Sequence, residues 1–382
     1  MLREEELESG AVSKRGLEIV RGEGCRIWDA NGKEYLDMGA SYGVCNVGHR
    51  NPMVLEALSR QMEEIMYISS SYDNPVRREC MDAILGISPP GMSRVFLCNS
   101  GTEAVEAAMK FSFRYTGRKG VVAAKRAFHG RTLGSLSLTW NPSYREGIEE
   151  RLVPVDFVSY GSIEEIGEKV TDQTAAVFLE PVQGEGGVHI PPSGYLREVR
   201  RICDEKGALL VVDEVQSGLC RTGRMLAIEH HDVVPDIICM GKSLAGGLPM
   251  GATVLNERMG PMPKGFHGST FGGSPLVCAA SIAALKFLKE NQMDKRSEEL
   301  GLRFLEGLRS IGSSQIREVR GQGLMIGVEL KSRTGPYLSN LLERGIAAIP
   351  TGSTVIRFLP PLIITEDDID RTVGTLAEVL DG

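Results

Sequence analysis

The sequence predicts an α/β fold in which helices cover a mainly parallel sheet, with a smaller α+β part beside it. Two observations support this prediction. From about residue 94 onward, short apolar runs typical of buried strands alternate with amphipathic segments typical of helices. The chain also has 382 residues, of which 42% are hydrophobic, so it can form one large core and a second, smaller one.

Composition narrows the class of protein. The net charge of −7 argues against nucleic acid as the main partner, because phosphate binding needs a basic face. No apolar run reaches the roughly 18 residues of a membrane span, and the acidic start lacks the apolar core of a signal peptide. We therefore expect a cytoplasmic protein that is not bound to membranes. The eight scattered cysteines favour buried free thiols, and the six histidines lack the spacing of a metal site.

The first 45 residues contain irregular structure and short strands. Asn31 and Gly32 lie between two alternating apolar runs, which predicts a β-hairpin. Helical periodicity begins after Asn51-Pro52, and the alternation of strands and helices continues to the long helical stretch that follows Pro275. We therefore expect a large α/β domain at residues 46–290.

The last part of the chain is expected to be rich in helices. It also contains two strand-like runs, at residues 323–330 and 354–360. The final helix has Thr365 as a predicted N-cap and Asp368 as the acid at its third position. Residues 1–45 and 291–382 together are expected to form the smaller α+β domain.

The first segment that suggests chemistry is Asn99–Ala104, which follows an apolar strand and opens a helix. A helix N-terminus has free N–H groups and a positive dipole end, so it can bind an anion. Gly101 would let the backbone approach a phosphate closely. The alternative is an ordinary capped helix.

The second segment is an apolar strand, residues 208–212, that ends in Asp213 and Glu214. Ligands bind at the carboxyl ends of strands in open α/β sheets. An acid in this place can bind a metal, a ribose hydroxyl or a protonated ring nitrogen, or it can simply cap the following turn.

The third segment is a strand that runs directly into Gly241-Lys242-Ser243. These three residues resemble the end of a phosphate-binding P-loop, but that motif needs a glycine where this chain has Asp236. The other interpretation is a lysine that forms a Schiff base, which must be partly desolvated so that its amine can be neutral. An isolated surface lysine is the remaining alternative.

One cofactor unites the three segments. Pyridoxal phosphate (PLP) needs a lysine for its aldehyde, an anion cup for its phosphate and an acid for its pyridinium nitrogen. Lys242, the turn at Gly101 and Asp213 supply these groups, and the spacing between Asp213 and Lys242 leaves room for one crossover between two strands.

With these motifs in view, the sequence resembles the class III (ornithine/acetylornithine-type) aminotransferases of PLP fold type I, from about Leu17 to the C-terminus. Seven motifs occur in order: NSGTEA at 99–104, FHGRT at 128–132, EPVQGEGG at 180–187, DEVQSG at 213–218, GKSLAGG at 241–247, HGSTFGG at 267–273 and IRFLPP at 356–361. The segments around residues 41–52, 131–146 and 317–331 resemble the LysW-aminoadipate semialdehyde transaminases in particular.

The resemblance implies a role for each matching residue. Lys242 would bind PLP covalently, and Arg131 would hold the α-carboxylate of the substrate. Glu185 and Arg357 match a pair that gates between the two half-reactions, and Ser269 would lie near the substrate. The other residues implied to bind the cofactor are Gly101 and Thr102 at the phosphate, Asp213 at the ring nitrogen, Gln216 at the phenolic oxygen, Phe128 and Val215 on the two ring faces, Glu214 beside them, and Thr270 from a partner subunit.

Several of these residues also have ordinary structural explanations. Taken alone, Phe128 fits a core position, Arg131 a surface position and Arg357 a structural ion pair. Tyr42 and Tyr72 lie in segments that border the substrate in relatives, and they fit packing equally well. His129 is expected to be a satisfied polar residue.

The resemblance implies an ω-aminotransferase that forms a homodimer with shared active sites. Glutamate, cycling to 2-oxoglutarate, would be the amino donor. The acceptor would be a terminal semialdehyde on a chain whose α-amino group is blocked by a small acidic carrier protein like LysW. The products would serve lysine and arginine biosynthesis. The alternatives are an N-acetylornithine aminotransferase, a semialdehyde aminomutase and an inactive homologue.

Overall fold

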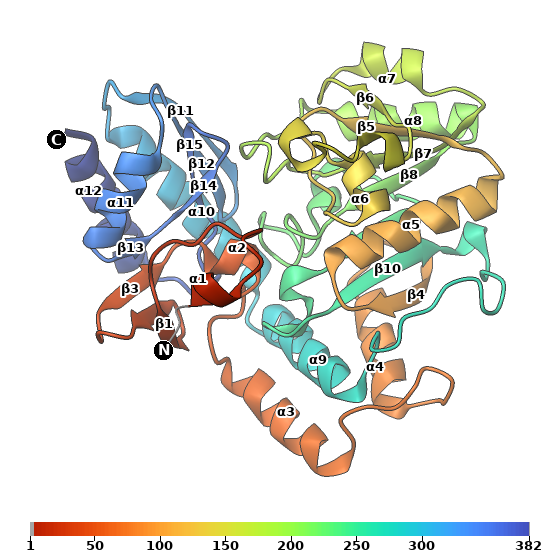
Figure 1. The fold of residues 1–382 in the computed structure, drawn as a ribbon, viewed down its shortest axis with the longest axis horizontal. Helices are drawn as coiled ribbons and strands as arrows, with labels where there is room; N and C mark the ends of the chain where they lie inside the picture. The colour runs from red at the N-terminus through yellow and green to blue at the C-terminus, as the bar shows by residue number, and fades with distance from the viewer. Residues whose placement is uncertain (1–3, 382) are drawn as a thin grey trace.

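A seven-stranded sheet forms the centre of the computed structural model, which describes residues 4–381. Six of its strands run in the same direction, and the seventh, β10, is antiparallel to both of its neighbours. The predicted mainly parallel sheet is therefore confirmed (Figure 1). In sheet order the strands are β4 (Met92–Cys98), β10 (Gly251–Asn256), β9 (Ile237–Met240), β8 (Leu209–Asp213), β7 (Thr174–Leu179), β5 (Gly120–Ala124) and β6 (Asp156–Val158).

Helices cover both faces of this sheet because its strands are apolar on both sides. Successive strand residues belong to two different cores: Leu209 and Val211 face one, Leu210 and Val212 the other. Helix α5 (Gly101–Thr116) buries its alanine-rich face in the first core, and α8 (Tyr195–Lys206) packs in the second. The other helices of this part are α3 (Pro52–Glu64), α4 (Pro75–Leu85), α6 (Leu133–Leu138), α7 (Ile163–Lys169) and α9 (Pro275–Glu290), with 3-10 turns η1 (Pro142–Tyr144), η2 (Glu149–Arg151), η3 (Ala227–His231), η4 (Lys242–Ala245) and η5 (Glu257–Met259).

A second sheet lies in the C-terminal part and is antiparallel. Its helices pack on it through buried leucines and phenylalanines such as Phe304, which contacts Phe358 with ring centres 5.2 Å apart. The strands, in sheet order, are β11 (Ile316–Gln322), β12 (Met325–Leu330), β15 (Val355–Phe358) and β14 (Ile349–Thr351), and the helices are α10 (Met293–Ser310), α11 (Gly335–Glu343) and α12 (Glu366–Asp381).

The N-terminal segment forms a third sheet that includes a strand from the far end of the chain. Strand β13 (Ile346–Ala347) pairs in parallel with β3 (Glu34–Asp37), next to β2 (Arg26–Asp29) and β1 (Ile19–Glu23). The red and blue segments of Figure 1 accordingly lie together. Two short helices lie on either side of β1–β3 in the sequence: α1 (Glu4–Leu7) precedes β1, and α2 (Ala40–Gly43) follows β3. The expected boundaries at residues 45 and 290 stay a prediction.

Local signals in the sequence define several element ends. The hairpin predicted at Asn31 and Gly32 joins β2 to β3. The Asn51 side chain accepts from the amide of Met53 at the start of α3. Thr365 and Asp368 form the predicted reciprocal capping box, with both bonds 3.2 Å long.

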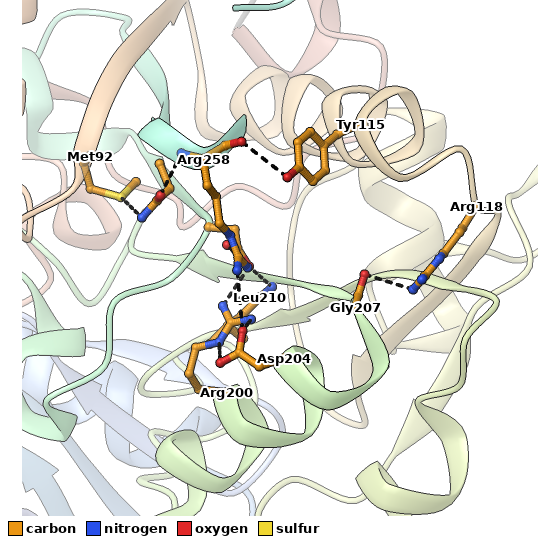
Figure 2. A network of polar contacts seen from close by, with 10 residues as sticks. Met92, Tyr115, Arg118, Arg200, Asp204, Gly207, Leu210 and Arg258 are labelled. Carbon is orange, nitrogen blue, oxygen red and sulfur yellow. Dashed lines mark hydrogen bonds and ion pairs between the residues drawn. The ribbon is translucent and has the colours of Figure 1, made fainter. Parts of the chain in front are cut away.

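A polar network joins the elements at the amino ends of β8 and β9, the sheet edge opposite the strand ends that carry Asp213 and Lys242 (Figure 2). The side chain of Asp236 is 2% exposed and accepts from the Leu210 amide and from Arg200, at 2.8 and 2.7 Å. It also pairs with Arg258, which comes from η5. Asp204 binds Arg200 at the exposed end of the network, so one buried carboxylate links β8, α8 and η5.

All eight cysteines are buried and free of disulfides. Between residues 4 and 381, no helix combines the length and the apolar character that crossing a membrane requires.

Candidate active site

A cavity of about 870 Å³ lies at the carboxyl end of β9, where Lys242 lines it. Asp213 is the last residue of β8, and Lys242 lies two residues beyond the end of β9. Five side chains singled out in the sequence line this cavity: Tyr42, Phe128, Arg131, Glu185 and Lys242. The fold therefore brings together residues that are up to 200 positions apart, as expected at the carboxyl edge of a parallel sheet.

Lys242 has a strained backbone and a perturbed amine. Its φ of 47° lies in the left-handed region, which is unfavourable for a residue with a Cβ. Burial lowers the pKa of Lys242 below its usual value, although the nearby carboxylates of Glu185 and Asp213 act in the opposite direction. An amine with a lowered pKa is more often neutral, so a larger fraction of it is available to act as a nucleophile or to accept a proton.

Asp213 is paired with His129, a contact that sequence reasoning missed. The His129 Nδ1 lies 2.8 Å from Asp213 Oδ2, and the two side chains are 0% and 5% exposed. Burial is the largest influence on the pKa of His129 and would lower it, but the hydrogen bond to Asp213 and the charges of Asp213 and Glu180 together outweigh burial, and the pKa is raised. The hydrogen bond from His129 Nδ1 therefore fixes the orientation of the Asp213 side chain. We expected the polar atoms of His129 to have hydrogen-bond partners, and this is wrong for its Nε2, which has none among the described residues.

The start of α5 forms an anion cup that contains more hydroxyl groups than predicted. Ser100 caps the helix by accepting from the Glu103 amide, and the amides of Gly101 and Thr102 have no partner within the helix. Thr102 Oγ1 lies 2.5 Å from Ser135 Oγ and 3.0 Å from Thr132 Oγ1. Ser135 and Thr132 come from the segment that follows the FHG motif, so a loop distant in sequence completes the cup.

Gly101 has a packing reason for being glycine. A Cβ at this position would lie 2.6 Å from Val215 Cγ1, and a Cβ on Gly241 would lie 3.0 Å from the Cα of Gly101. The backbone before Lys242, the side chain of Val215 and the start of α5 are therefore in close contact at the bottom of the site.

Glu185, Gln216 and Arg357 form a buried polar triad. Arg357 is 0% exposed, and its Nη1 lies 2.7 Å from Glu185 Oε1 and 2.9 Å from Gln216 Oε1. Burial would raise the pKa of Glu185, but the Arg357 guanidinium outweighs burial and the pKa is lowered. Nε and Nη2 of Arg357 have no partner among the described residues, so this buried cation has donors left for a ligand.

Arg131 is a second cation with free donors. Its guanidinium carbon lies 4.3 Å from the ring centre of Tyr144 and 5.8 Å from that of Phe128. Among the described residues 4–381, no carboxylate forms an ion pair with Arg131. The aromatic pair therefore orients an exposed guanidinium toward the cavity. Tyr144 was not predicted as a site residue, and only its place in the segment that resembles the relatives pointed to it.

Glu214, which the resemblance places beside the cofactor-binding residues, has hydrogen-bond partners within the protein. Its carboxylate accepts from the Ile228 amide and the Ser217 hydroxyl at 2.7 and 2.8 Å, and burial raises its pKa to about 7. We therefore assign it a structural role in holding the loop after β8.

Ser269 and Thr270 lie in a different cavity, of about 570 Å³, together with Asn99 and Glu106. Ser269 Oγ accepts from Asn99 at 3.0 Å, and the Thr270 carbonyl accepts from the Tyr67 hydroxyl at 2.8 Å. The single chain thus does not bring these two residues to Lys242. The side chain of Tyr72, 65% exposed, is likewise outside the lysine cavity.

Comparisons with known proteins agree with this geometry. The family described as aminotransferase class III matches residues 9–380. A LysW-aminoadipate semialdehyde transaminase from Deinococcus radiodurans is 45% identical, over 99% of this chain and 89% of the relative. An acetylornithine aminotransferase from Methanopyrus kandleri is 43% identical, over 96% and 95% of the two chains. The crystal structure of an ornithine aminotransferase from Toxoplasma gondii superposes with a TM-score of 0.93 at 34% identity, covering 98% of this chain and 93% of the other.

Proposed function

The chain belongs to the class III aminotransferases, which depend on pyridoxal 5'-phosphate, and from this premise we propose its substrates. It transfers an amino group between glutamate or 2-oxoglutarate and the terminal semialdehyde of an amino acid whose α-amino group is blocked. The block is a small acidic carrier protein like LysW, and the product serves lysine biosynthesis, with arginine biosynthesis as a second pathway. The free buried thiols are in keeping with a cytoplasmic location.

The residues present fit the cofactor. The free amides at the start of α5, with the hydroxyl cluster of Thr102 beside them, suit a phosphate. The buried acid Asp213 suits a pyridinium nitrogen, and the amine of Lys242 suits the aldehyde. The residues that would hold PLP are Gly101, Thr102, Phe128, Asp213, Val215, Gln216 and Lys242, with Thr270 of the partner subunit. When bound, PLP supplies an electron sink for a carbanion next to the amino nitrogen.

The protein's own groups then have separate roles. Lys242 Nζ would accept a proton from the substrate carbon and return it, which its lowered pKa favours. Asp213, held by His129 and by the Val215 amide at 2.9 Å, would keep a proton on the ring nitrogen. Arg131 would hold the α-carboxylate by a bidentate contact.

The observation that supports the proposal most directly is the second cation, Arg357. Glutamate has two carboxylates, and Arg357 has two free donors for the one that Arg131 does not bind. The blocked ω-amine substrate presents one free carboxylate, and with it bound Glu185 would keep Arg357 paired, which avoids an unpaired buried charge. A site with this switch suits an enzyme that alternates between a dicarboxylate donor and a monocarboxylate acceptor.

The charge of the cavity supports an acidic carrier. Two arginines, Arg126 and Arg131, line it, against the single acid Glu185 among the described lining residues, although the whole chain has a net charge of −7. Such a local basic surface would attract an acidic protein, and the attraction would weaken as ionic strength rises.

The second candidate is an N-acetylornithine aminotransferase, which the Methanopyrus kandleri relative favours. A transamination assay with both substrates at increasing salt separates the two. We expect the apparent KM for carrier-linked substrate to rise steeply with salt, while that for N-acetylornithine barely changes. No turnover of the carrier form, or equal salt dependence for both, would favour the second candidate.

We also propose a homodimer with shared sites. Thr270 lies outside the lysine cavity of its own chain and in a surface cavity next to the start of α5. A two-fold dimer would place Thr270 of the partner subunit at the anion cup, twice in each dimer.

A further inference from the structure

Residues Ala40–Gly43, the short helix α2, form a left-handed turn. Their φ angles are 41°, 51°, 64° and 81°, and only the last of the four is glycine. The turn is closed by the amides of Gly43 and Val44, which donate to Gly39 and Ala40 at 3.1 and 2.8 Å. Three successive residues with a Cβ in this conformation are unfavourable, and such strain persists only where the surrounding structure enforces it.

The turn presents Tyr42 to the active-site cation. Tyr42 lines the lysine cavity, and the guanidinium carbon of Arg357 lies 5.6 Å from the centre of its ring. The turn also lies close to the triad, because a Cβ added to Gly43 would be 4.0 Å from Gln216 Cγ and 3.8 Å from Leu359 Cδ1. The aromatic ring therefore covers one side of a buried guanidinium whose other donors are free.

Two residues outside the cavity hold the turn. One oxygen of Asp37 accepts from the amides of Gly39 and Ala40, at 3.1 and 2.8 Å. The other lies 2.7 Å from His49 Nε2, and the two side chains are 7% and 17% exposed. The hydrogen bond to Asp37, with a second one to Cys45, raises the pKa of His49 to about 10, so His49 is charged at neutral pH. An ionised acid binds amide groups strongly, and the charged histidine fixes its orientation.

We propose that Asp37 and His49 are positioning residues for donor specificity: they hold the left-handed turn so that Tyr42 covers Arg357 and favours the dicarboxylate donor. The inference rests on the proposed role of Arg357 in binding glutamate. The ring stabilises the cation when Glu185 has moved away from it, and it limits the space in which the second carboxylate can bind. Without the pair, the strained turn relaxes and Tyr42 leaves the guanidinium.

The test compares Asp37→Ala with two other variants. Tyr42→Leu removes the ring and leaves the turn's anchors. Asp29→Ala is the matched control, because Asp29 caps the nearby hairpin by accepting from the Asn31 and Lys33 amides, both at 2.9 Å, and lies outside the lysine cavity. The measurements are hydrogen exchange of the peptide containing residues 38–48 in the holoenzyme, and the KM of each half-reaction. His49→Gln provides a milder variant should Asp37→Ala fold poorly.

We expect faster exchange at residues 39–45 in Asp37→Ala and His49→Gln, but not in Tyr42→Leu or Asp29→Ala. The KM for glutamate should rise about 2- to 30-fold in Asp37→Ala and Tyr42→Leu, the range that loss of a cation–π contact gives, with Tyr42→Phe restoring it. The KM for the ω-amine substrate should change less than about twofold.

Faster exchange with an unchanged KM for glutamate would overturn the proposal, and so would unchanged exchange in Asp37→Ala or an equal rise in KM for both substrates. If the wild-type protein does not react with glutamate, the proposed function fails. In that case the exchange comparison still decides whether Asp37 holds the turn.

Discussion

Replacing Arg357 by alanine should impair one half-reaction far more than the other. Arg357 is fully buried and, among the residues that the structure describes, only its Nη1 has partners, so Nε and Nη2 can donate to a carboxylate of glutamate. Loss of such a charge-assisted contact costs about 2–5 kcal/mol, which corresponds to roughly 30- to several-thousand-fold in kcat/KM. The ω-amine half-reaction should lose much less, because its carboxylate is held by Arg131.

Single-turnover spectra measure the two halves separately, starting from the PLP form for one substrate and from the aminated form for the other. Glu185→Gln is the matched variant: it leaves Arg357 without its ion pair, so it should impair the ω-amine half-reaction more than the glutamate one. Equal losses in both halves for Arg357→Ala would refute the switch and make the residue structural.

Four other predictions follow from the same structure. Borohydride should fix the cofactor to the peptide containing Lys242, and cofactor fixed to any other peptide would contradict the assignment. Lys242→Ala should lower turnover by several orders of magnitude. Mixing Lys242→Ala with Thr270→Ala protein should restore activity through hybrid dimers with one intact site, and no recovery after subunit exchange would argue against shared sites. Asp236→Asn should lower the free energy of unfolding by about 2–4 kcal/mol, because it breaks a buried network (Figure 2). Asp204→Asn should lower it by less than about 1 kcal/mol, because Asp204 is 52% exposed at the end of that network. Chemical denaturation measures both losses, and equal losses would contradict the idea that Asp236 is the centre of the network. The folded-state pKa of His49 is raised to about 10, so the stability that charged His49 contributes is fully present below its ordinary pKa near 6.5 and is lost as the pH rises to 10. The free energies of unfolding of wild type and His49→Gln should therefore differ at pH 6 and converge at pH 10. The same difference at both pH values would contradict the ion pair.

The sequence was most informative where chemistry and local structure coincide. The strand ends carrying Asp213 and Lys242 could be predicted because apolar runs stop at polar residues. The link between His129 and Asp213 could not, because the residues are 84 positions apart and no local pattern states which strand end faces which loop. The left-handed turn was missed for a different reason: Ala40, Ser41 and Tyr42 contain no glycine or asparagine, the usual signal for positive φ. For Glu214 the resemblance implied a place beside the cofactor, whereas its carboxylate bonds to Ile228 and Ser217, because neighbouring side chains at a strand end point in different directions.

The pairing of β3 with β13 determines when the active site can be completed during synthesis. Ile346 pairs with Leu36, so a ribosome working at roughly 5–20 residues per second makes the second strand about 15–60 s after the first. During that interval Asp37 emerges without its strand partner, and the turn that follows it has no neighbour at Leu359 to pack against. A nascent chain should therefore form the central sheet first and gain Tyr42 in its final place only when the last tenth of the protein has left the ribosome.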